Sequence, residues 1–191
     1  MKTKLLTLTA FLALFLTANA QVNIEERMKK ENVVRGMIIQ NGKETEGYIK
    51  KVNEKRSLDD VTYNAFDKFQ SDISFIPKND FETAEKLTKK MYVKVEPKTA
   101  EGYKYIYESG DTLVYESVKY ADKSEISLRM IAKPVFLRVE SKGRLEIYTY
   151  YVSPPSLLIG NEIREYYEAA GEPIIVYRRA GNEKSPEMIE F

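Results

Sequence analysis

From residue 33 onward, apolar and polar positions mostly alternate along the chain, which is the period of a half-buried β-strand. The first alternating stretch spans 33–50 and is divided by Asn41 and Gly42. An Asn-Gly pair is the strongest short signal for a hairpin, because both residues accept the positive φ angles of a type I′ turn. The stretch therefore predicts two antiparallel strands joined by a two-residue loop.

The two-residue loop also fixes which residues of this hairpin face each other. Gly36 faces Gly47, and two glycines opposite each other leave a notch in the sheet. Such a notch predicts that a large side chain or another stretch of backbone crosses the hairpin there. The predicted pairs are Ile38 with Thr45, Gly36 with Gly47, and Val34 with Ile49.

A second hairpin is predicted for GYKYIYESGDTLVY at 102–115, where Tyr103, Tyr105 and Tyr107 share one face of the extended chain. Two loop lengths are open: three residues ending at Gly110, or two residues. Half-buried strands select aromatic residues at alternate positions, so we interpret these tyrosines as packing residues rather than as a ligand platform. The longer loop pairs Tyr103 with Tyr115 and Tyr105 with Leu113, whereas the shorter loop pairs Tyr105 with Val114.

The clearest hairpin pattern is VFLRVESKGRLEIYTYYV at 135–152. A three-residue loop from Ser141 to Gly143 places apolar residues on one face and complementary charges on the other. Tyr148 and Tyr150 fall on the charged face, where a phenol offers a ligand a flat apolar ring with a hydrogen-bonding tip. These two tyrosines are therefore the candidate ligand-binding residues. The predicted pairs are Val139 with Leu145, Leu137 with Ile147, Glu140 with Arg144, and Arg138 with Glu146.

One short helix is predicted in the middle of the chain, at about 80–90. Asn79 stands at the N-cap position and Glu82 follows three residues later, which is the spacing of a capping box. Apolar residues then recur at helical spacing. Short strands are predicted on either side of this helix, at 71–78 and 91–96.

A loop at 153–160 carries three adjacent apolar residues, Leu157, Leu158 and Ile159. Such a cluster is unusual in a segment that faces water. It either folds back as a plug on one end of the sheet or forms a contact surface for a partner protein. These three residues are the candidate partner-binding residues.

The segment at 161–171 admits two interpretations. Asn161 as a cap and Gly171 as a stop would make it a helix, whereas a turn at Ala170 and Gly171 would make it the first strand of a hairpin. We favour the hairpin, because the β-branched run at 174–177 requires a strand.

Together these patterns predict a single, mainly β domain over 33–180. Its antiparallel hairpins form a curled sheet, a partly open barrel or a two-sheet sandwich, with one short helix at about 80–90. A polar lead-in at 21–32 precedes the domain, and a loose tail at 181–191 follows it. The charged stretch at 53–60 is predicted to be a loop.

The first twenty residues are predicted to be a secretory signal peptide. Lys2 and Lys4 precede an apolar run, which is followed by a triplet of small residues ending at Ala20. The run is shorter than the ~20 residues that a membrane-spanning helix needs. We therefore expect a periplasmic or extracellular protein that begins at Gln21 and has no membrane span. It is not expected to be a lipoprotein, because no cysteine stands at the cleavage point.

The composition narrows the possible chemistry. The chain contains no Cys and no His, so it lacks a disulfide framework, a thiolate nucleophile and the commonest general base and zinc ligand. Ser-His-Asp triads, Cys-His pairs and zinc-hydrolase sites are excluded, and no metal or other cofactor is expected. Without Lys2 and Lys4, 28 basic residues stand against 29 acidic ones, so no overall positive field attracts nucleic acid.

Three segments carry a resemblance to a known group of proteins. They are RGMIIQNGKETEGYIK, EGYKYIYESGDTLVYESV and FLRVESKGRLEIYTYYV, and they follow the expected signal peptide. With them the chain resembles a group of uncharacterised exported β-rich proteins from Bacteroidetes-type bacteria. The shared features are glycines at turns and aromatic residues in strands. The resemblance implies an envelope location and a mainly β fold, and it implies no activity or catalytic residues.

The sequence thus favours an exported, non-enzymatic protein of the cell envelope that acts as a binding or structural module. An envelope glycan or another envelope protein is the candidate partner. The first alternative is an inhibitor or assembly factor that binds its partner through the 153–160 loop. The second is a carboxylate-dependent glycan hydrolase, because glycoside cleavage needs only two well-placed carboxyl groups. The candidate carboxylates are Glu116, Glu140, Glu146 and Glu165.

Overall fold

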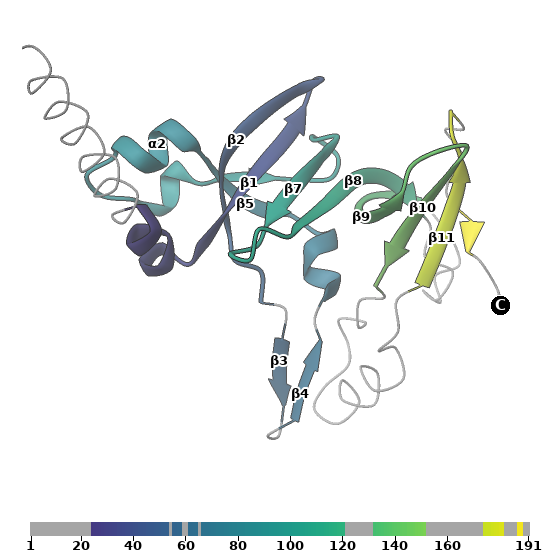
Figure 1. Ribbon diagram of the computed structural model, residues 1–191, viewed down its shortest axis with the longest axis horizontal. Coiled ribbons are helices and arrows are strands. Elements are labelled where there is room, and N and C mark those ends of the chain that lie inside the picture. The colour runs from purple at the N-terminus through teal and green to yellow at the C-terminus, as the bar shows by residue number, and fades with distance from the viewer. Residues whose placement is uncertain are drawn as a thin grey trace, which may run out of the picture.

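A computed structural model describes residues 24–53, 55–58, 61–64, 66–120, 132–151, 174–181 and 187–188. The protein is mainly β, and its dominant feature is one long antiparallel sheet (Figure 1). The sheet twists along its length, so that β10 and β11 lie far from β1 and β2.

The long sheet has ten strands in the order β12-β11-β10-β9-β8-β7-β1-β2-β5-β6. It is open, because its end strands β12 and β6 do not pair with each other, and this confirms the predicted mainly β fold in its open, curled form. The strands of the sheet are β1 (Val33–Gln40), β2 (Lys43–Lys50), β5 (Ile73–Pro77), β6 (Val93–Val95), β7 (Gly102–Ile106), β8 (Thr112–Tyr120), β9 (Lys133–Ser141), β10 (Leu145–Tyr150), β11 (Ile174–Arg179) and β12 (Glu187–Met188).

The first predicted hairpin is confirmed in every pair. Val34 faces Ile49, Gly36 faces Gly47 and Ile38 faces Thr45. Asn41 and Gly42 have φ angles of 54° and 68°, as the type I′ turn requires.

The glycine notch in this hairpin is filled, as predicted. A Cβ atom at Gly47 would lie 2.5 Å from the ring of Phe75, and one at Gly36 would lie 2.8 Å from Cγ1 of Ile49 and 2.9 Å from the carbonyl oxygen of Lys104. Real Cβ atoms do not come so close to other heavy atoms. The two glycines are therefore needed so that neighbouring strands and side chains can pack against β1 and β2.

The second hairpin, β7–β8, takes the three-residue loop. Tyr103 faces Tyr115, and Tyr105 faces Leu113. The rings of Tyr103 and Tyr115 stack with centroids 4.7 Å apart and planes at 8°. Tyr103, Tyr105 and Tyr115 are all buried, so the tyrosine ladder packs in the core, as we interpreted it from the sequence.

The main core lies on the face of the sheet that carries these tyrosines. The short 3-10 helix η1 (Phe66–Gln70) is packed against it, and the Phe69 side chain is fully buried there. The hydroxyl of Tyr103 donates a 2.6 Å hydrogen bond to the carbonyl oxygen of Phe69. The side-chain amide of Gln70 binds both the N–H and the C=O of Tyr151, at 2.5 and 2.6 Å. These contacts fix η1 to the sheet.

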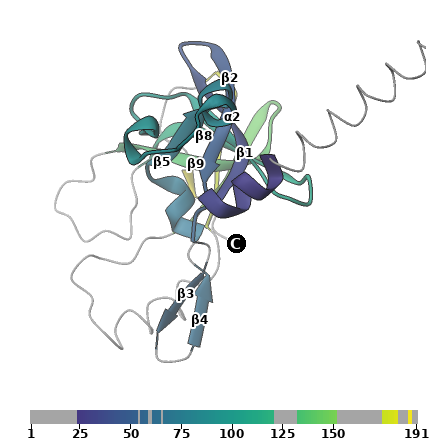
Figure 2. The ribbon, with the colours of Figure 1, turned by 90° about the vertical axis from the view of Figure 1, so that its left-hand side faces the viewer.

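Two helices lie against the other face of β1 and β2, which we call the helix face. One is the N-terminal helix at 24–31, within the predicted polar lead-in, and the other is α2 (Lys78–Thr83). Figure 2 shows both helices in front of the strands. The buried residues of this second core are Val33, Tyr48, Ile76 and Phe81, and Ile24, Met28, Leu87, Met91 and Tyr92 pack against them.

The predicted helix at about 80–90 is shorter than expected and starts earlier. The α-helix α2 ends at Thr83, and after an irregular stretch only a 3-10 turn, η2 (Lys89–Met91), follows. Asn79 lies inside the helix instead of capping it, because Pro77 occupies the N-cap position. Pro77 has φ −57° and ψ 147°, the extended backbone typical of an N-cap residue. The apolar spacing beyond Thr83 reflects burial against the sheet rather than helical geometry.

The register predicted for the third hairpin, β9–β10, is wrong. Tyr148 faces Val139 and Thr149 faces Arg138, with a bulge between Ile147 and Tyr148. The prediction considered this hairpin alone, whereas β10 also pairs with β11. That second pairing sets Glu146 opposite Arg178, so the basic partners of Glu146 are Arg178 on β11 and Lys142 in the β9–β10 loop instead of Arg138 on β9.

A small hairpin of β3 (Lys55–Leu58) and β4 (Val61–Asn64) forms a separate two-stranded sheet, where the sequence predicted a charged loop. Several predictions lie outside the described residues. They are the signal peptide at 1–20, the apolar loop at 153–160, the helix-or-hairpin segment at 161–171, and most of the tail at 181–191.

Candidate functional site

A groove lies on the helix face, between the N-terminal helix at 24–31 and strands β1, β2 and β7. It consists of two neighbouring cavities with volumes of about 560 and 360 Å³. Arg35 and Ile106 line both cavities, so these two residues stand where the cavities adjoin. The N-terminal helix forms one wall, and α2 borders the larger cavity.

Strand alternation explains why these side chains share one face. Along β1, Val34 points into the main core, so Arg35 and Met37 point to the helix face. The strand register then places Arg35 beside Tyr48 on β2 and beside Ile106 on β7. Tyr48, Arg35 and Ile106 therefore form one row across the floor of the groove.

The rest of the groove lining is mixed in character. Its apolar surface comes from residues of the N-terminal helix and of the strands, and two of these residues are flexible methionines. The apolar and aromatic residues of the lining are Ile24, Met28, Met37, Tyr48, Ile106 and Tyr107.

Among the residues that the structure describes, three charged lining residues make no side-chain hydrogen bond and no ion pair, namely Glu25, Lys29 and Arg35, and of these Arg35 is the one on the floor of the groove. The Arg35 guanidinium is exposed. Glu25 and Lys29 are four residues apart on one helix, where opposite charges are neighbours. The other charged lining residues are paired as Glu46 with Lys78 at 3.3 Å, Glu82 with Tyr48 at 2.7 Å, and Glu108 with Lys51 at 2.7 Å.

The Tyr48 hydroxyl also has a hydrogen-bond partner, the Glu82 side chain, to whose carboxylate it donates. Burial, and then this hydrogen bond, raise the pKa of Tyr48 well above its ordinary value, although the nearby Arg35 acts in the opposite direction. Tyr48 is therefore a neutral floor residue at physiological pH, and it forms no ion pair with the neighbouring Arg35.

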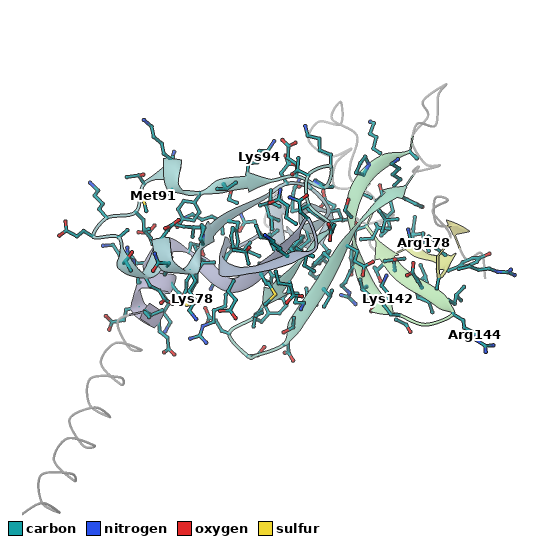
Figure 3. The ribbon with its side chains drawn as sticks, turned by 90° about the horizontal axis from the view of Figure 1, so that it is seen from above. Lys78, Met91, Lys94, Lys142, Arg144 and Arg178 are labelled. Carbon is teal, nitrogen blue, oxygen red and sulfur yellow. The ribbon has the colours of Figure 1, made fainter. Side chains whose placement is uncertain are left out.

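The structure places Tyr148, one of the two predicted ligand-binding residues, inside a charged cluster at the other end of the sheet. Its ring is fully buried. Lys142 and Arg178 donate to its hydroxyl at 2.8 and 2.9 Å, and the carboxylates of Glu116 and Glu146 lie 3.1 and 3.0 Å from the same oxygen. Figure 3 shows Lys142 and Arg178 together at this end.

The cluster is electrically balanced, with two acids and two bases around one phenol. Burial is the largest influence on the Tyr148 hydroxyl and raises its pKa to about 12. Burial also acts to raise the pKa of Glu146, but hydrogen bonds from Arg178, Lys142 and Tyr148 outweigh it and lower that pKa. Each member thus has a partner of opposite charge, which is the arrangement of a stabilising network.

This network predicts an acid-sensitive contribution to stability. Because folding lowers the pKa of Glu146, its contribution is complete above the unfolded value of about 4.3 and is lost as the pH falls through the folded value. We expect Glu146→Gln to lower the free energy of unfolding by about 1–2 kcal/mol at pH 7 and by much less at pH 3. Urea unfolding at both pH values measures the difference.

The control for this experiment is Glu44→Gln, which removes an exposed carboxylate paired with Lys104 on the surface. It is expected to change the free energy of unfolding by less than about 0.5 kcal/mol at either pH. An equal loss for Glu146→Gln at pH 7 and pH 3 would contradict the ionic role of Glu146.

The other predicted site residues are placed as follows. Tyr150 is buried, and its ring lies 4.7 Å from that of Tyr120. Glu140 accepts hydrogen bonds from Arg138 and Thr149, so it is not part of the Tyr148 cluster. Glu165 and the apolar residues Leu157, Leu158 and Ile159 lie outside the described residues. A ligand-binding role for Tyr148 and Tyr150 stays a prediction.

The sequence analysis missed the groove and its central residue, Arg35. One signal was available, since the confirmed hairpin register already set Arg35 beside Tyr48 on the face opposite Val34 and Ile49. The walls formed by β7 and α2 come from residues distant in sequence, and no local pattern connects them to Arg35.

No group of three or more acidic side chains suited to holding a metal ion occurs among the residues that the structure describes. Within the same residues, no helix has the length and apolar character that a membrane span requires. Comparisons with protein-family models, curated proteins and solved structures gave no match. The resemblance to exported Bacteroidetes-type proteins therefore stays a prediction.

Proposed function

We propose that the protein is an exported, non-enzymatic binding module of the cell envelope, whose groove on the helix face takes up a small amphipathic molecule. The observation that carries this proposal is the pair of cavities joined at Arg35 and Ile106. Their volumes, about 560 and 360 Å³, lie within the range of small-molecule sites, and such sites combine apolar walls with a few polar groups.

The chemistry of the groove lining supports binding rather than turnover. Methionine side chains adapt to ligands of different shape, and Met28 and Met37 line the two cavities. The carboxylates Glu46, Glu82 and Glu108 are held in pairs with Lys78, Tyr48 and Lys51.

The hydrolase alternative finds less support. Glu116 and Glu146 do lie close together, since both contact the Tyr148 hydroxyl. However, a general acid in glycoside cleavage needs a raised pKa, and the pKa of Glu146 is lowered. Lys142 also bridges the two carboxylates, at 2.5 and 3.1 Å.

The proposed export rests on the sequence. Lys2 and Lys4, the apolar run that follows them and the small residues ending at Ala20 have the pattern of a cleaved signal peptide. The absence of cysteine from the chain fits an envelope protein that is stabilised by its core rather than by disulfides.

The binding function can be tested with N-phenyl-1-naphthylamine, a neutral dye that fluoresces in apolar surroundings. We expect the chain without its predicted signal peptide, residues 21–191, to bind the dye saturably at one site. Met37→Trp fills the larger cavity and is expected to abolish most of the fluorescence increase. Val93→Trp is the matched control, because Val93 is 55% exposed on the edge strand β6 and is expected to bind as the wild type does.

Ile106→Trp is a second blocking variant, used in case Met37→Trp fails to fold. Circular dichroism checks the folding of both variants. The proposal is contradicted if the wild-type protein shows no saturable binding. It is also contradicted if both blocking variants fold and still bind the dye like the wild type.

A further inference from the structure

The charged and apolar residues of the groove indicate which class of ligand it binds, and this inference rests on the proposed binding function. We propose that the ligand is an amphiphile with an anionic head, a carboxylate or a phosphate, which Arg35 binds while the apolar body occupies the adjoining cavity.

The first argument is the position of Arg35. It lies on the central row of the groove floor, with Tyr48 beside it on β2 and Ile106 beside it on β7. It lines both cavities, so a head group bound there has apolar space on either side. A guanidinium offers several N–H donors in a planar fork, which suits the paired oxygens of a carboxylate or a phosphate.

The second argument is that Arg35 has no counter-ion among the described residues. Four carboxylates line the cavities: Glu25 lies four residues from Lys29 on one helix, and Glu46, Glu82 and Glu108 each have another partner. Those partners are Lys78, Tyr48 and Lys51. Because none of these acids forms an ion pair with Arg35, its N–H donors stay available to an anionic group of a ligand.

The third argument is the apolar surface on both sides of Arg35. Met37 and Ile24 line the larger cavity, and Met28 lines the smaller one. Ile106 is common to both. A purely polar anion would leave this surface in water, whereas an apolar body attached to the anionic head would cover it, at about 25 cal/mol for each Å² buried. The two features together favour an amphiphile over a free inorganic anion.

The experiment measures how well dodecanoate, dodecyl phosphate and dodecanol displace bound N-phenyl-1-naphthylamine, each below its micelle-forming concentration. Dodecyl phosphate and dodecanol share one alkyl chain, and that of dodecanoate is one carbon shorter, so the three compounds differ mainly in the head group. We expect the better anion to bind about tenfold more tightly than dodecanol, as a charge-assisted hydrogen-bonded pair predicts. Comparing the two anions shows whether a carboxylate or a phosphate is preferred.

Arg35→Gln tests the assigned residue. It is expected to remove most of the preference for the anions over dodecanol, and Arg35→Lys is expected to restore part of it, because the charge returns without the planar fork. Lys104→Gln is the matched control. Lys104 is two residues from Ile106 on β7, but it is paired with Glu44 at 3.0 Å and is absent from both linings. Its loss is expected to leave the preference unchanged.

The outcomes separate this inference from the proposed function. Equal displacement by all three compounds, or a preference for the anions that persists in Arg35→Gln, overturns the anionic ligand and leaves the binding groove in place. Failure of the dye itself to bind overturns the proposed function. Inorganic phosphate is added as a fourth competitor, and displacement by phosphate as strong as that by dodecyl phosphate would overturn the role of the apolar body.

Discussion

Replacing Phe69 with alanine is expected to lower the free energy of unfolding by about 3–5 kcal/mol, the largest loss among the substitutions considered. The Phe69 side chain is fully buried. Its ring packs edge-on against Tyr105 with centroids 5.1 Å apart and stacks on Tyr115 at 5.6 Å. Removing the ring leaves a cavity between η1 and the sheet, at the point where Tyr103 binds the η1 backbone.

Urea unfolding followed by circular dichroism measures this loss. Val93→Ala is the control, because Val93 is 55% exposed, and it is expected to change the free energy of unfolding by less than about 0.5 kcal/mol. A loss below about 1 kcal/mol for Phe69→Ala would show that η1 does not close the main core.

Replacing Gly47 with alanine is expected to cost about 2–3 kcal/mol, although it adds only one methyl group. The new Cβ would lie within 2.5 and 2.6 Å of two atoms of the Phe75 ring and would also meet the carbonyl oxygen of Ile76. A backbone oxygen cannot rotate away as a side chain does. Strand β5 would therefore have to separate from β2, or the Phe75 ring would have to leave its site.

Gly143→Ala is the matched control, since a Cβ there has only the Leu145 carbonyl oxygen near it, at 3.9 Å. It is expected to be neutral or slightly stabilising, because alanine restricts the unfolded chain more than glycine does. Thermal unfolding of both variants gives the comparison. Equal melting temperatures for Gly47→Ala and Gly143→Ala would contradict the close packing assigned to the glycine notch.

The sequence predicted those parts of the fold that depend on neighbouring residues. The Asn41-Gly42 turn sets the register of β1 and β2 by itself, since its two positive φ angles allow one tight loop. For the β7–β8 hairpin the sequence left two registers open. The structure has the register of the three-residue loop, in which Tyr103 and Tyr115 stack.

Predictions failed where a distant segment decides the local structure. The local charge pattern of β9–β10 favoured one register, but the structure has a different one. Strand β10 also pairs with β11, and a pattern within β9–β10 does not include this second partner. The apolar spacing after Thr83 resembled a helix because those residues pack against the sheet around Tyr48 and Phe81.

The groove could not be predicted from the sequence for the same reason. Arg35 and the N-terminal helix are near each other in the chain, but Ile106 is distant from both, and only the order of β7, β1 and β2 in the sheet brings it beside them. Arg35 by itself looks like any polar residue on the outer face of an alternating strand.

The most direct test of the groove is an NMR titration of residues 21–191, carrying ¹³C-labelled methionine methyl groups, with N-phenyl-1-naphthylamine. Met28 and Met37 line the two cavities, whereas Met188 belongs to β12, at the opposite end of the sheet from β6. We expect the resonances of Met28 and Met37 to shift saturably with one dissociation constant while that of Met188 stays in place. Shifts of similar size at all three, or none at Met28 and Met37, would contradict a binding site on the helix face.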